Sequence, residues 1–308
     1  MRPETGHGGR VLVTGATGFI GRALCSHLLH AGIEVRGTTR RHSHDHLLHV
    51  GDVHGATDWG HALTGVRTVV HLAGKSAARR GRDDLALLQV NVEGAVNLAR
   101  QAARAKVKRL IYLSSVKVLG ESSPTPFTAH ASPNPATPYA WSKHEAEQAL
   151  AGVARQSGLE LVILRPPLVY GRGAAGNFGK LLRLAASGLP LPLASVNNQR
   201  SLLSLDSLCD LILLCLHHPE APRHAWLAAD GSLSTPALFR LLAAAMGKPA
   251  RLFPASPTVL RLFGELSGTG DLLARLLDSL EVDDSLTRRL LGWRPACPLA
   301  EGLRRCLA

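Results

Sequence analysis

The sequence predicts a doubly wound α/β fold with a parallel sheet, followed by a smaller and mostly helical C-terminal domain. Near the N-terminus, at 11–30, an apolar segment runs into a glycine-punctuated turn and then an amphipathic segment. Apolar segments alternate with helical periodicity as far as Pro166. Beyond that point the alternation loosens, and short helices separated by Gly and Pro follow. This order of elements is typical of a Rossmann-type domain joined to a substrate-binding domain.

The glycine turn after the first strand is suited to hold a phosphate. Gly15 permits a tight turn, Gly18 lets the backbone approach a pyrophosphate, and Gly21 lets the helix pack closely on the sheet. The first N–H groups of that helix have no internal partner and lie at the positive end of its dipole, so they favour an anion. Ordinary strand-to-helix turns also contain glycines, but this context favours nucleotide binding. The expected cofactor contacts are Gly15, Thr17, Gly18, Phe19, Ile20 and Gly21.

The end of the second strand, at 33–39, indicates which dinucleotide binds. An acidic residue there would hydrogen-bond the ribose of NAD, whereas arginine accommodates the additional phosphate of NADP. Thr39 occupies the acidic position and Arg40 follows it, so the sequence favours NADP, with NAD as the alternative. The competing interpretation is that Arg40 and Arg41 are solvated loop charges that bind no phosphate. Asp52, at the end of a predicted third strand, either accepts from the adenine amino group or forms a turn.

Four histidines, at positions 42, 44, 46 and 49, follow the second strand. They have no cysteine or paired carboxylate framework beside them, and Asp45 stands alone. A surface loop explains them better than a metal site does, so no metal is expected.

The strand at 66–72 leads into small residues at Ala73-Gly74, where the backbone must lie close to a cofactor. Leu72 and Ala73 are therefore predicted to contact the cofactor, and Lys75 the substrate. The next helix, at 83–104, places Asn91 among apolar residues, and a buried asparagine needs partners. Asn91 would either support the active-site strand through a water molecule or take part in simple helix packing.

A catalytic group is predicted where the strand at 108–115 ends in serines and the following helix begins. Thr137 is the expected N-cap and Pro138 the first helical residue. Tyr139 and Lys143 are four residues apart and share a helix face. A lysine ammonium near a phenol stabilises the phenolate, so such a tyrosine can exchange a proton, while Ser115 orients the same substrate oxygen. If the Tyr–Lys spacing occurred without the other motifs, the alternative would be a solvated pair of side chains on the helix surface.

The strand at 159–167 is ended by two prolines, of which Pro166 is expected to contact the cofactor. Later elements are a helix from Asn177 to 187, a strand that begins at Arg200, and a helix at 206–217. The predicted dinucleotide-binding domain comprises 10–166 and about 204–230. The predicted substrate domain comprises about 167–203 and 231–308, and residues 1–9 are expected to form a loose tail.

Composition limits the partners. The chain has 308 residues, 45% hydrophobic and 4% aromatic, with a net charge of +12. Because no run of basic residues is interleaved with aromatics, anionic small ligands explain the charge better than nucleic acid does. The five scattered cysteines indicate a reducing compartment. Since the sequence has neither a signal peptide nor an apolar run of membrane-spanning length, we expect a cytoplasmic protein without membrane insertion.

Motifs in the same order along nearly the whole chain allow a family to be named. They are TGATGFIG from Thr14, HLAG from His71, NVEG from Asn91, Ser114-Ser115, YAWSK from Tyr139, Arg165-Pro166 and LGW from Leu291. The chain resembles the extended short-chain dehydrogenase/reductases, in particular the UDP-glucose 4-epimerase-like nucleotide-sugar branch. The resemblance implies that Ser115, Tyr139 and Lys143 are catalytic, that Tyr139 and Lys143 also contact the cofactor, and that Lys143 holds the nicotinamide ribose. It further implies that Asn177 and Arg200 hold the substrate pyrophosphate, and that a homodimer forms through the helices at 83–104 and 139–156.

Further segments, SVKVLGE from Ser115, GLPLPL from Gly188 and SVNNQRS from Ser195, resemble bacterial O-antigen enzymes that handle UDP-N-acetylhexosamines. The first functional hypothesis is an NADPH-dependent reductase of a UDP-4-keto-6-deoxy-N-acetylhexosamine in surface polysaccharide synthesis. The second is a UDP-hexose or UDP-N-acetylhexosamine 4-epimerase with tightly bound NAD. The third belongs to another class, a non-catalytic NAD(P)-sensing protein. Leu119 and Leu168 depart from the pattern of this branch, so the sequence does not identify the sugar of the substrate.

Overall fold

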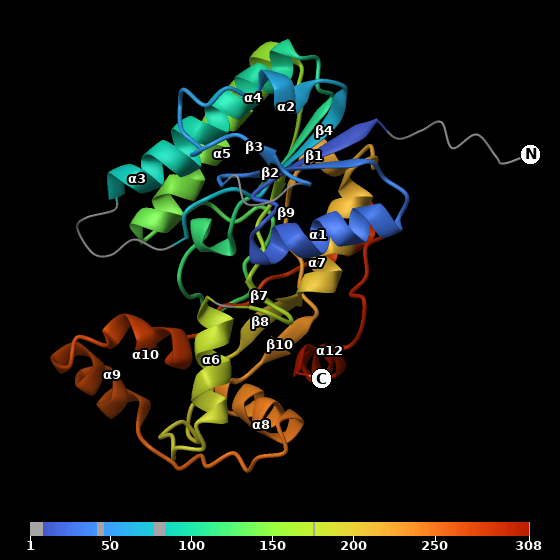
Figure 1. Cartoon of the computed structure of the whole chain (residues 1–308). Coiled ribbons are helices and arrows are strands. Elements are labelled where there is room, and N and C mark those ends of the chain that lie inside the picture. Colours follow the sequence, from blue (N-terminus) through green and yellow to red (C-terminus); the bar gives the residue numbers. More distant parts are fainter. Residues whose placement is uncertain (1–8, 42–45, 77–83, 175, 308) are drawn as a thin grey trace, which may run out of the picture. The chain divides into compact units, whose positions relative to one another are not determined.

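The computed structural model describes residues 9–41, 46–76, 84–174 and 176–307 (Figure 1). They divide into two compact units, each assembled from three segments of the chain. Residues 119–132 fall in the second unit, whereas the sequence analysis placed them in the first. The first unit is Met1–Val118, Pro133–Arg165 and Cys209–Trp226, and the second is Leu119–Ser132, Pro166–Leu208 and Leu227–Ala308. The predicted tail at 1–9 lies outside the described residues, apart from Gly9.

The first unit is built on a seven-stranded sheet whose strand order is β3-β2-β1-β4-β5-β6-β9. Every neighbouring pair is parallel, which confirms the predicted doubly wound sheet. Strand order reverses between β1 and β4, and in such sheets ligands bind beyond the carboxyl ends of the strands at that point. The strands are β1 (Arg10–Thr14), β2 (Val35–Thr39), β3 (Leu48–His49), β4 (Val66–His71), β5 (Arg109–Leu113), β6 (Glu160–Leu164) and β9 (Ala225–Trp226).

Helices cover both faces of this sheet (Figure 1). One face packs against α4 (Gly94–Arg104) and α5 (Pro138–Ser157), which lie side by side, and the other against α1 (Phe19–His30). The apolar core on the α4/α5 side joins Leu12, Val69 and Leu110 of the strands to Leu98 and Leu150 of the helices. Burying each such side chain contributes roughly 1.5–3 kcal/mol. The remaining helical elements are α2 (Gly60–Leu63), α3 (Asp84–Leu88), a π-helical turn (Gln89–Glu93) and the 3₁₀ turns Val116–Val118 and Ala221–Arg223.

Helix α5 begins where the sequence predicted. The Thr137 side chain accepts a hydrogen bond from the backbone N–H of Ala140 at 3.3 Å, and Pro138 is the first helical residue. The helix ends at Gly158, whose φ of 73° is the left-handed conformation that favours glycine at a helix end. The cap fixes where α5 begins, and it therefore places Tyr139 and Lys143 in the first turns of the helix.

Three expected elements differ in their limits. The third strand ends at His49, before Gly51 and Asp52, which form a loop. The helix expected at 83–104 contains a π-helical turn between α3 and α4. The strand expected to reach residue 167 ends at Leu164, because Pro166 and Pro167 have no N–H to continue a ladder.

The second unit contains a three-stranded sheet in the order β10-β8-β7, which the sequence analysis did not anticipate as a sheet. Its core includes Phe178, Leu202, Phe239 and Leu303. No helix in the described ranges of the chain combines the length and the apolar character needed to cross a membrane. The elements are β7 (Leu168–Tyr170), β8 (Arg200–Ser204), β10 (Gly231–Leu233), α6 (Asn177–Ala186), α8 (Thr235–Ala245), α9 (Pro257–Leu266), α10 (Gly270–Leu277), α11 (Ser285–Leu291) and α12 (Leu299–Leu307); α7 (Leu205–Cys215) contributes residues to both units.

Candidate active site

The glycine turn lies at the carboxyl end of β1, next to the first residues after β4. Gly15 has a φ of 68°, and a Cβ on it would lie 2.9 Å from the backbone nitrogen of Ala73. A Cβ on Gly21 would overlap the carbonyl oxygen of Gly15, so only glycine allows α1 to start so close to the turn. Gly18 is the N-cap residue of α1, and no side chain caps that helix start within the described residues. The N–H groups at 19–21 therefore form a seat for a phosphate.

Thr14 joins the ends of β1 and β4. Its hydroxyl oxygen accepts from the backbone N–H groups of Leu72 and Ala73 at 3.2 and 3.1 Å, and it is 2.7 Å from Nδ1 of His71. Burial and, to a smaller extent, the Lys143 charge together lower the pKa of His71 to about 3, so the imidazole is neutral. The two segments predicted to contact the cofactor, Gly15–Gly21 and Leu72–Ala73, are thus held together by side-chain bonds rather than by sheet pairing alone.

Asn91, in the π-helical turn, is 1% exposed and fully bonded. Its Oδ1 accepts from the N–H of Lys75 at 2.8 Å, and its Nδ2 donates to the Lys75 carbonyl and to Oγ of Ser142, each at 2.9 Å. Asn91 therefore fixes the loop after β4 against helix α5 by direct contacts, which goes beyond simple helix packing. π-helical turns often occur where a side chain must be aimed in this way.

Lys143 is 6% exposed and lies among three elements at the carboxyl edge of the sheet. Its Nζ donates to the hydroxyl of Tyr112 on β5 at 2.9 Å and lies 4.3 Å from the centre of that ring. A Cβ built on Gly74 would be 3.8 Å from the same Nζ, which places the ammonium beside the loop after β4. Burial lowers the pKa of Lys143 from 10.5 to about 7, while the Glu147 carboxylate acts in the opposite direction.

Tyr112 was not identified from the sequence. It is fully buried on β5, and its ring stacks on that of His71, with 5.9 Å between the ring centres. Burial raises the pKa of Tyr112 well above its usual value, and Tyr139 and Glu147 raise it further. Tyr112 therefore stays a neutral phenol that accepts from Lys143. Its place in the strand, three residues before Ser115, was the available signal, but an inward-facing aromatic on a strand usually belongs to the core.

A buried ion pair lies one helical turn beyond Lys143. Arg165 donates to both carboxylate oxygens of Glu147, at 3.0 and 2.6 Å, and Oγ of Ser114 donates to the same carboxylate. Both charged side chains are at most 10% exposed. The pair ties α5 to the residue that follows β6, and the serine ties it to the end of β5. The sequence analysis missed this pair because its members are far apart in the chain.

Tyr139 and Ser115 flank these buried groups. Tyr139 is half-buried in the first turn of α5, and its carbonyl accepts from Oγ of Ser142 at 2.8 Å. Its phenol is near enough to Tyr112 to affect the pKa of that residue. Ser115, half-buried after β5, accepts through Oγ from the N–H of Lys117 at 3.3 Å. Ser115, Tyr139 and Lys143 thus all belong to the first unit, at the carboxyl edge of its sheet.

The two residues predicted to bind the adenosine end contact each other. Nε of Arg40 lies 3.6 Å from Oδ1 of Asp52, and both side chains are mostly exposed. Thr39, at the end of β2, uses its hydroxyl oxygen to accept from the N–H of Arg41. Arg40 is therefore next to a carboxylate, which would repel a ribose 2′-phosphate in the same place.

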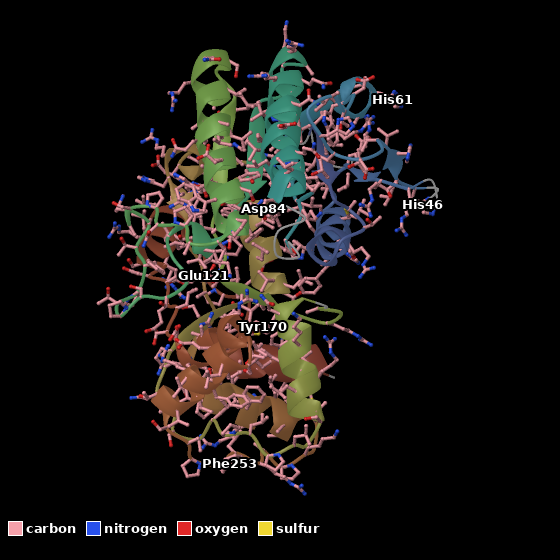
Figure 2. The ribbon with its side chains drawn as sticks, turned by 90° about the vertical axis from the view of Figure 1, so that its left-hand side faces the viewer. His46, His61, Asp84, Glu121, Tyr170 and Phe253 are labelled. Carbon is pink, nitrogen blue, oxygen red and sulfur yellow. The ribbon has the colours of Figure 1, made fainter. Side chains whose placement is uncertain are left out.

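The predicted pyrophosphate ligands lie in the second unit. Arg200 Nη1 donates to the Asp278 carbonyl at 2.9 Å, and Asn177 Oδ1 accepts from Arg275 at 3.3 Å. Burial lowers the pKa of Arg200, Asp278 and Glu121 raise it, and Arg275 lowers it (Glu121 is labelled in Figure 2). The sequence analysis did not single out Arg275, whose guanidinium lies close to both predicted residues. Pro166 is buried and is the first residue of the second segment of this unit.

The histidine segment and the cysteines add no ligand set that the structure describes. His42 and His44 lie outside the described residues, and His49 bonds the Arg40 carbonyl through its ring at 3.1 Å. Within the described ranges, no three His, Cys, Asp or Glu side chains are grouped to hold a metal ion. All five cysteines, each in the described part of the chain, are free thiols.

The fold and these contacts define a Rossmann-type α/β protein, with a glycine turn at the point where strand order reverses and a Ser, Tyr and Lys set beyond the next strands. The chain belongs to the NAD dependent epimerase/dehydratase family, which its residues 11–228 match. The sequence is 39% identical to that of a UDP-glucose 4-epimerase from Vibrio cholerae over 306 residues, 96% of this chain and 93% of the relative.

Solved structures share the fold over the full length of the chain. The Bordetella bronchiseptica enzyme WbmG in complex with NAD superposes with a TM-score of 0.77 at 22% identity, covering 100% of this chain and 95% of that one. A UDP-glucose 4-epimerase from Thermotoga maritima, solved with UDP-glucose, gives a TM-score of 0.76 at 22% identity, covering 97% of both chains. These likenesses confirm the Rossmann-type architecture.

Proposed function

We propose that the protein is a UDP-sugar 4-epimerase that retains NAD and acts on a UDP-hexose or UDP-N-acetylhexosamine. The observation that carries the proposal is the position of Lys143, buried beside Gly74 and on the same helix as Tyr139. Such a pair serves proton transfer at a sugar hydroxyl next to a hydride acceptor. The relative named UDP-glucose 4-epimerase, at 39% identity over most of the chain, supports the choice of reaction.

The residues present fit a dinucleotide. The uncapped start of α1 and the positive φ of Gly15 leave space and N–H donors for a pyrophosphate. Thr17, Phe19 and Ile20 would contact it through the backbone of the turn, while Leu72, Ala73 and Pro166 would line the remaining path. The Arg40–Asp52 contact favours NAD over NADP, because a 2′-phosphate would have to displace or neutralise a carboxylate.

The chain's own residues supply the proton chemistry. Tyr139 would take the proton from the sugar O4 hydroxyl and return it after the sugar has turned over, while Ser115 hydrogen-bonds the same oxygen. Lys143 would hold its ammonium near the phenol and the nicotinamide ribose, and Tyr112 and Glu147 would help to keep that ammonium charged. When bound, NAD supplies the reversible hydride acceptor for C4.

The charges of the second unit suit the diphosphate of the substrate. Arg275 is close enough to lower the pKa of Arg200, and an anion bound between the two side chains would offset that effect. Asn177, at the start of α6, would add a neutral donor. We assign Lys75 to the sugar end, because its backbone is fixed by Asn91 at the catalytic edge.

The test is mass identification of the nucleotide that co-purifies, followed by an assay without added cofactor. We expect bound NAD and interconversion of UDP-glucose with UDP-galactose, or of their N-acetylated forms. Purified protein that holds no nicotinamide nucleotide and interconverts none of these sugars would contradict the proposal. Retained nucleotide without turnover on any UDP-sugar would instead favour a sensing role.

A second candidate is the NADPH-dependent reduction of a UDP-4-keto-6-deoxy-N-acetylhexosamine for surface polysaccharide synthesis. This reaction is favoured by Arg40 and by the threonine at position 39, where NAD-binding proteins have an acidic residue. If that ketosugar oxidises added NADPH and reacts little with NADH, the reductase is favoured over the epimerase.

We further propose that the enzyme is a cytoplasmic homodimer. Apolar side chains are exposed on α3 and α5, with Leu85 76%, Leu88 42% and Trp141 51% exposed. Two copies that packed these helices together would cover those surfaces. The free thiols suit a reducing compartment. Light scattering of the purified protein, with Leu85→Lys as the disrupting variant, measures the oligomeric state.

A further inference from the structure

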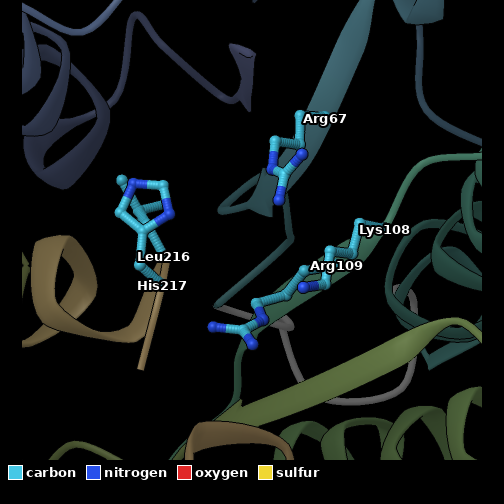
Figure 3. A pocket seen from close by; sticks show the side chains of 5 residues that line it. All are labelled: Arg67, Lys108, Arg109, Leu216 and His217. Carbon is cyan, nitrogen blue, oxygen red and sulfur yellow. The ribbon is translucent and has the colours of Figure 1, made fainter. Parts of the chain in front are cut away.

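Basic side chains gather at the amino edge of the first unit's sheet, at the opposite ends of the strands from the predicted catalytic group. A pocket of about 340 Å³ is lined there by Arg67, Lys108, Arg109, Leu216 and His217. Figure 3 shows the three cationic side chains directed toward the same space, with His217 across from them. Nothing in the proposed reaction uses these residues.

The positive charge in this pocket exceeds the negative charge around it. Glu160 pairs with Arg109, whose Nε donates to it at 2.7 Å, and lies 3.6 Å from Nζ of Lys108. Arg109 also donates to the Cys215 carbonyl at the end of α7, so its charge is largely engaged. One carboxylate thus faces three cations, which leaves a net local charge of about +2.

Arg67 is held in place along its stem rather than at its head. A Cβ on Gly9 would lie 2.6 Å from Cβ of Arg67, so the backbone at Gly9 packs directly on the aliphatic part of that side chain. No ion pair of Arg67 occurs among the described residues. The guanidinium therefore lines the pocket, and no carboxylate of the described residues neutralises its charge.

We propose that this pocket is a second anion site, which binds the phosphate group of a small ligand through Arg67, Lys108 and His217. Arg109 closes the base of the pocket, and its bonds to Glu160 and Cys215 keep it rigid. Guanidinium, ammonium and imidazolium groups around one cavity are the donors that phosphate oxygens use. A volume of about 340 Å³ is at the lower end of the range for small-molecule sites, so a phosphate with a small organic group fits.

The charges around His217 give the site a pH dependence with a definite sign. Burial lowers the pKa of His217, and Arg109, Arg67 and Lys108 lower it further. The charged groups that act on it are these three cations, of which Lys108 and Arg109 are paired with Glu160. A bound dianion offsets the cations, so it raises the pKa of His217, and binding strengthens as the pH falls through that range.

The test is an NMR titration of the His217 ring in the full-length protein, with sulfate exchanged for chloride at constant ionic strength. Sulfate keeps its charge between pH 5 and 8, so any pH dependence comes from the protein. We expect the pKa of His217 to rise by about half a unit or more. The signal is assigned by its loss in His217→Gln, and the exposed His61 in the same unit provides an internal reference.

Two charge variants test the placement of the ligand. Arg67→Ala and Lys108→Ala should each reduce the sulfate-induced shift at least twofold, whereas Arg155→Ala, an exposed arginine on α5, should leave it unchanged. Inorganic phosphate and AMP are then compared at equal concentrations. Equal affinities identify free phosphate as sufficient, and tighter binding of AMP identifies a nucleotide. A His217 signal that no anion moves, or one that moves equally in all three variants, would overturn the proposal.

Discussion

Two ion pairs at opposite edges of the parallel sheet differ in burial. At the carboxyl edge, Glu147 and Arg165 are buried and bonded to each other, and Lys143 is buried against a phenol. At the amino edge, Arg10 and Glu34 form an ion pair that water reaches, and Arg67 and Lys108 are exposed. The difference teaches that burial, rather than the presence of charge alone, shifts the pKa of a side chain. Only at the carboxyl edge does the environment move the pKa of a lysine to about 7.

The largest change expected at the carboxyl edge follows Tyr139→Phe, which removes the hydroxyl that we propose transfers the proton. We expect kcat to fall about 10²–10⁴-fold, the usual contribution of general acid–base catalysis. The measurement is sugar turnover together with the amount of nicotinamide nucleotide that co-purifies, so that a loss of cofactor is told apart from a loss of proton transfer. Wild-type kcat in this variant would exclude Tyr139 from proton transfer.

The next change breaks the buried ion pair. Glu147→Gln leaves the Arg165 guanidinium buried without its counter-charge, and breaking a buried pair costs about 3–5 kcal/mol in the free energy of unfolding. Urea unfolding followed by circular dichroism measures it. Glu147→Leu combined with Arg165→Met should recover much of the stability, because it removes both charges together. A Glu147→Gln protein as stable as the wild type would show that water reaches the pair.

Tyr112→Phe should leave the fold intact and move the pH profile. Losing the Tyr112 hydroxyl removes an acceptor from the Lys143 ammonium, so the pKa of Lys143 drops below about 7. If activity requires charged Lys143, it is present below this pKa and lost as pH rises through it. The alkaline limb of kcat should therefore shift by about one unit toward lower pH. Tyr170→Phe, which removes another buried hydroxyl that donates to Asp230, should not move that limb.

The smallest effect is expected at the amino edge. Glu34→Gln breaks the ion pair with Arg10, in which the Glu34 side chain is 60% exposed. Exposed pairs contribute about 0–1 kcal/mol, so unfolding in urea should change by no more than that. A loss as large as that of Glu147→Gln would mean that burial does not separate the two edges.

Features set by neighbouring residues were the ones that the sequence predicted well. The glycine turn, the Thr137 cap and the parallel order of strands each follow from short segments, and the structure has them in the expected places. Tyr139 and Lys143 lie four residues apart on α5, as the sequence predicted, and their catalytic role stays a prediction.

Contacts between distant segments could not be predicted in this way. Glu147 and Arg165 come together because α5 and the end of β6 pack on one another, and neither residue has a local pattern that points to the other. The contact between Asp52 and Arg40, on which the proposal of NAD rests, could not be predicted for the same reason. Asn91 was an intermediate case: its need for partners was evident from its apolar neighbours, but their identity, Lys75 and Ser142, was not.

The last strand of the seven-stranded sheet, β9, has a consequence for how the protein is made. It comes some sixty residues after its partner β6, so the sheet stays incomplete on the ribosome until Trp226 has been synthesised. By then the second unit still lacks 227–308. Translation therefore finishes the seven-stranded sheet first, at a rate of about 5–20 residues per second, and residues 227–308 follow within seconds. A ribosome stalled before Trp226 would hold a nascent chain whose β6 edge is still unpaired.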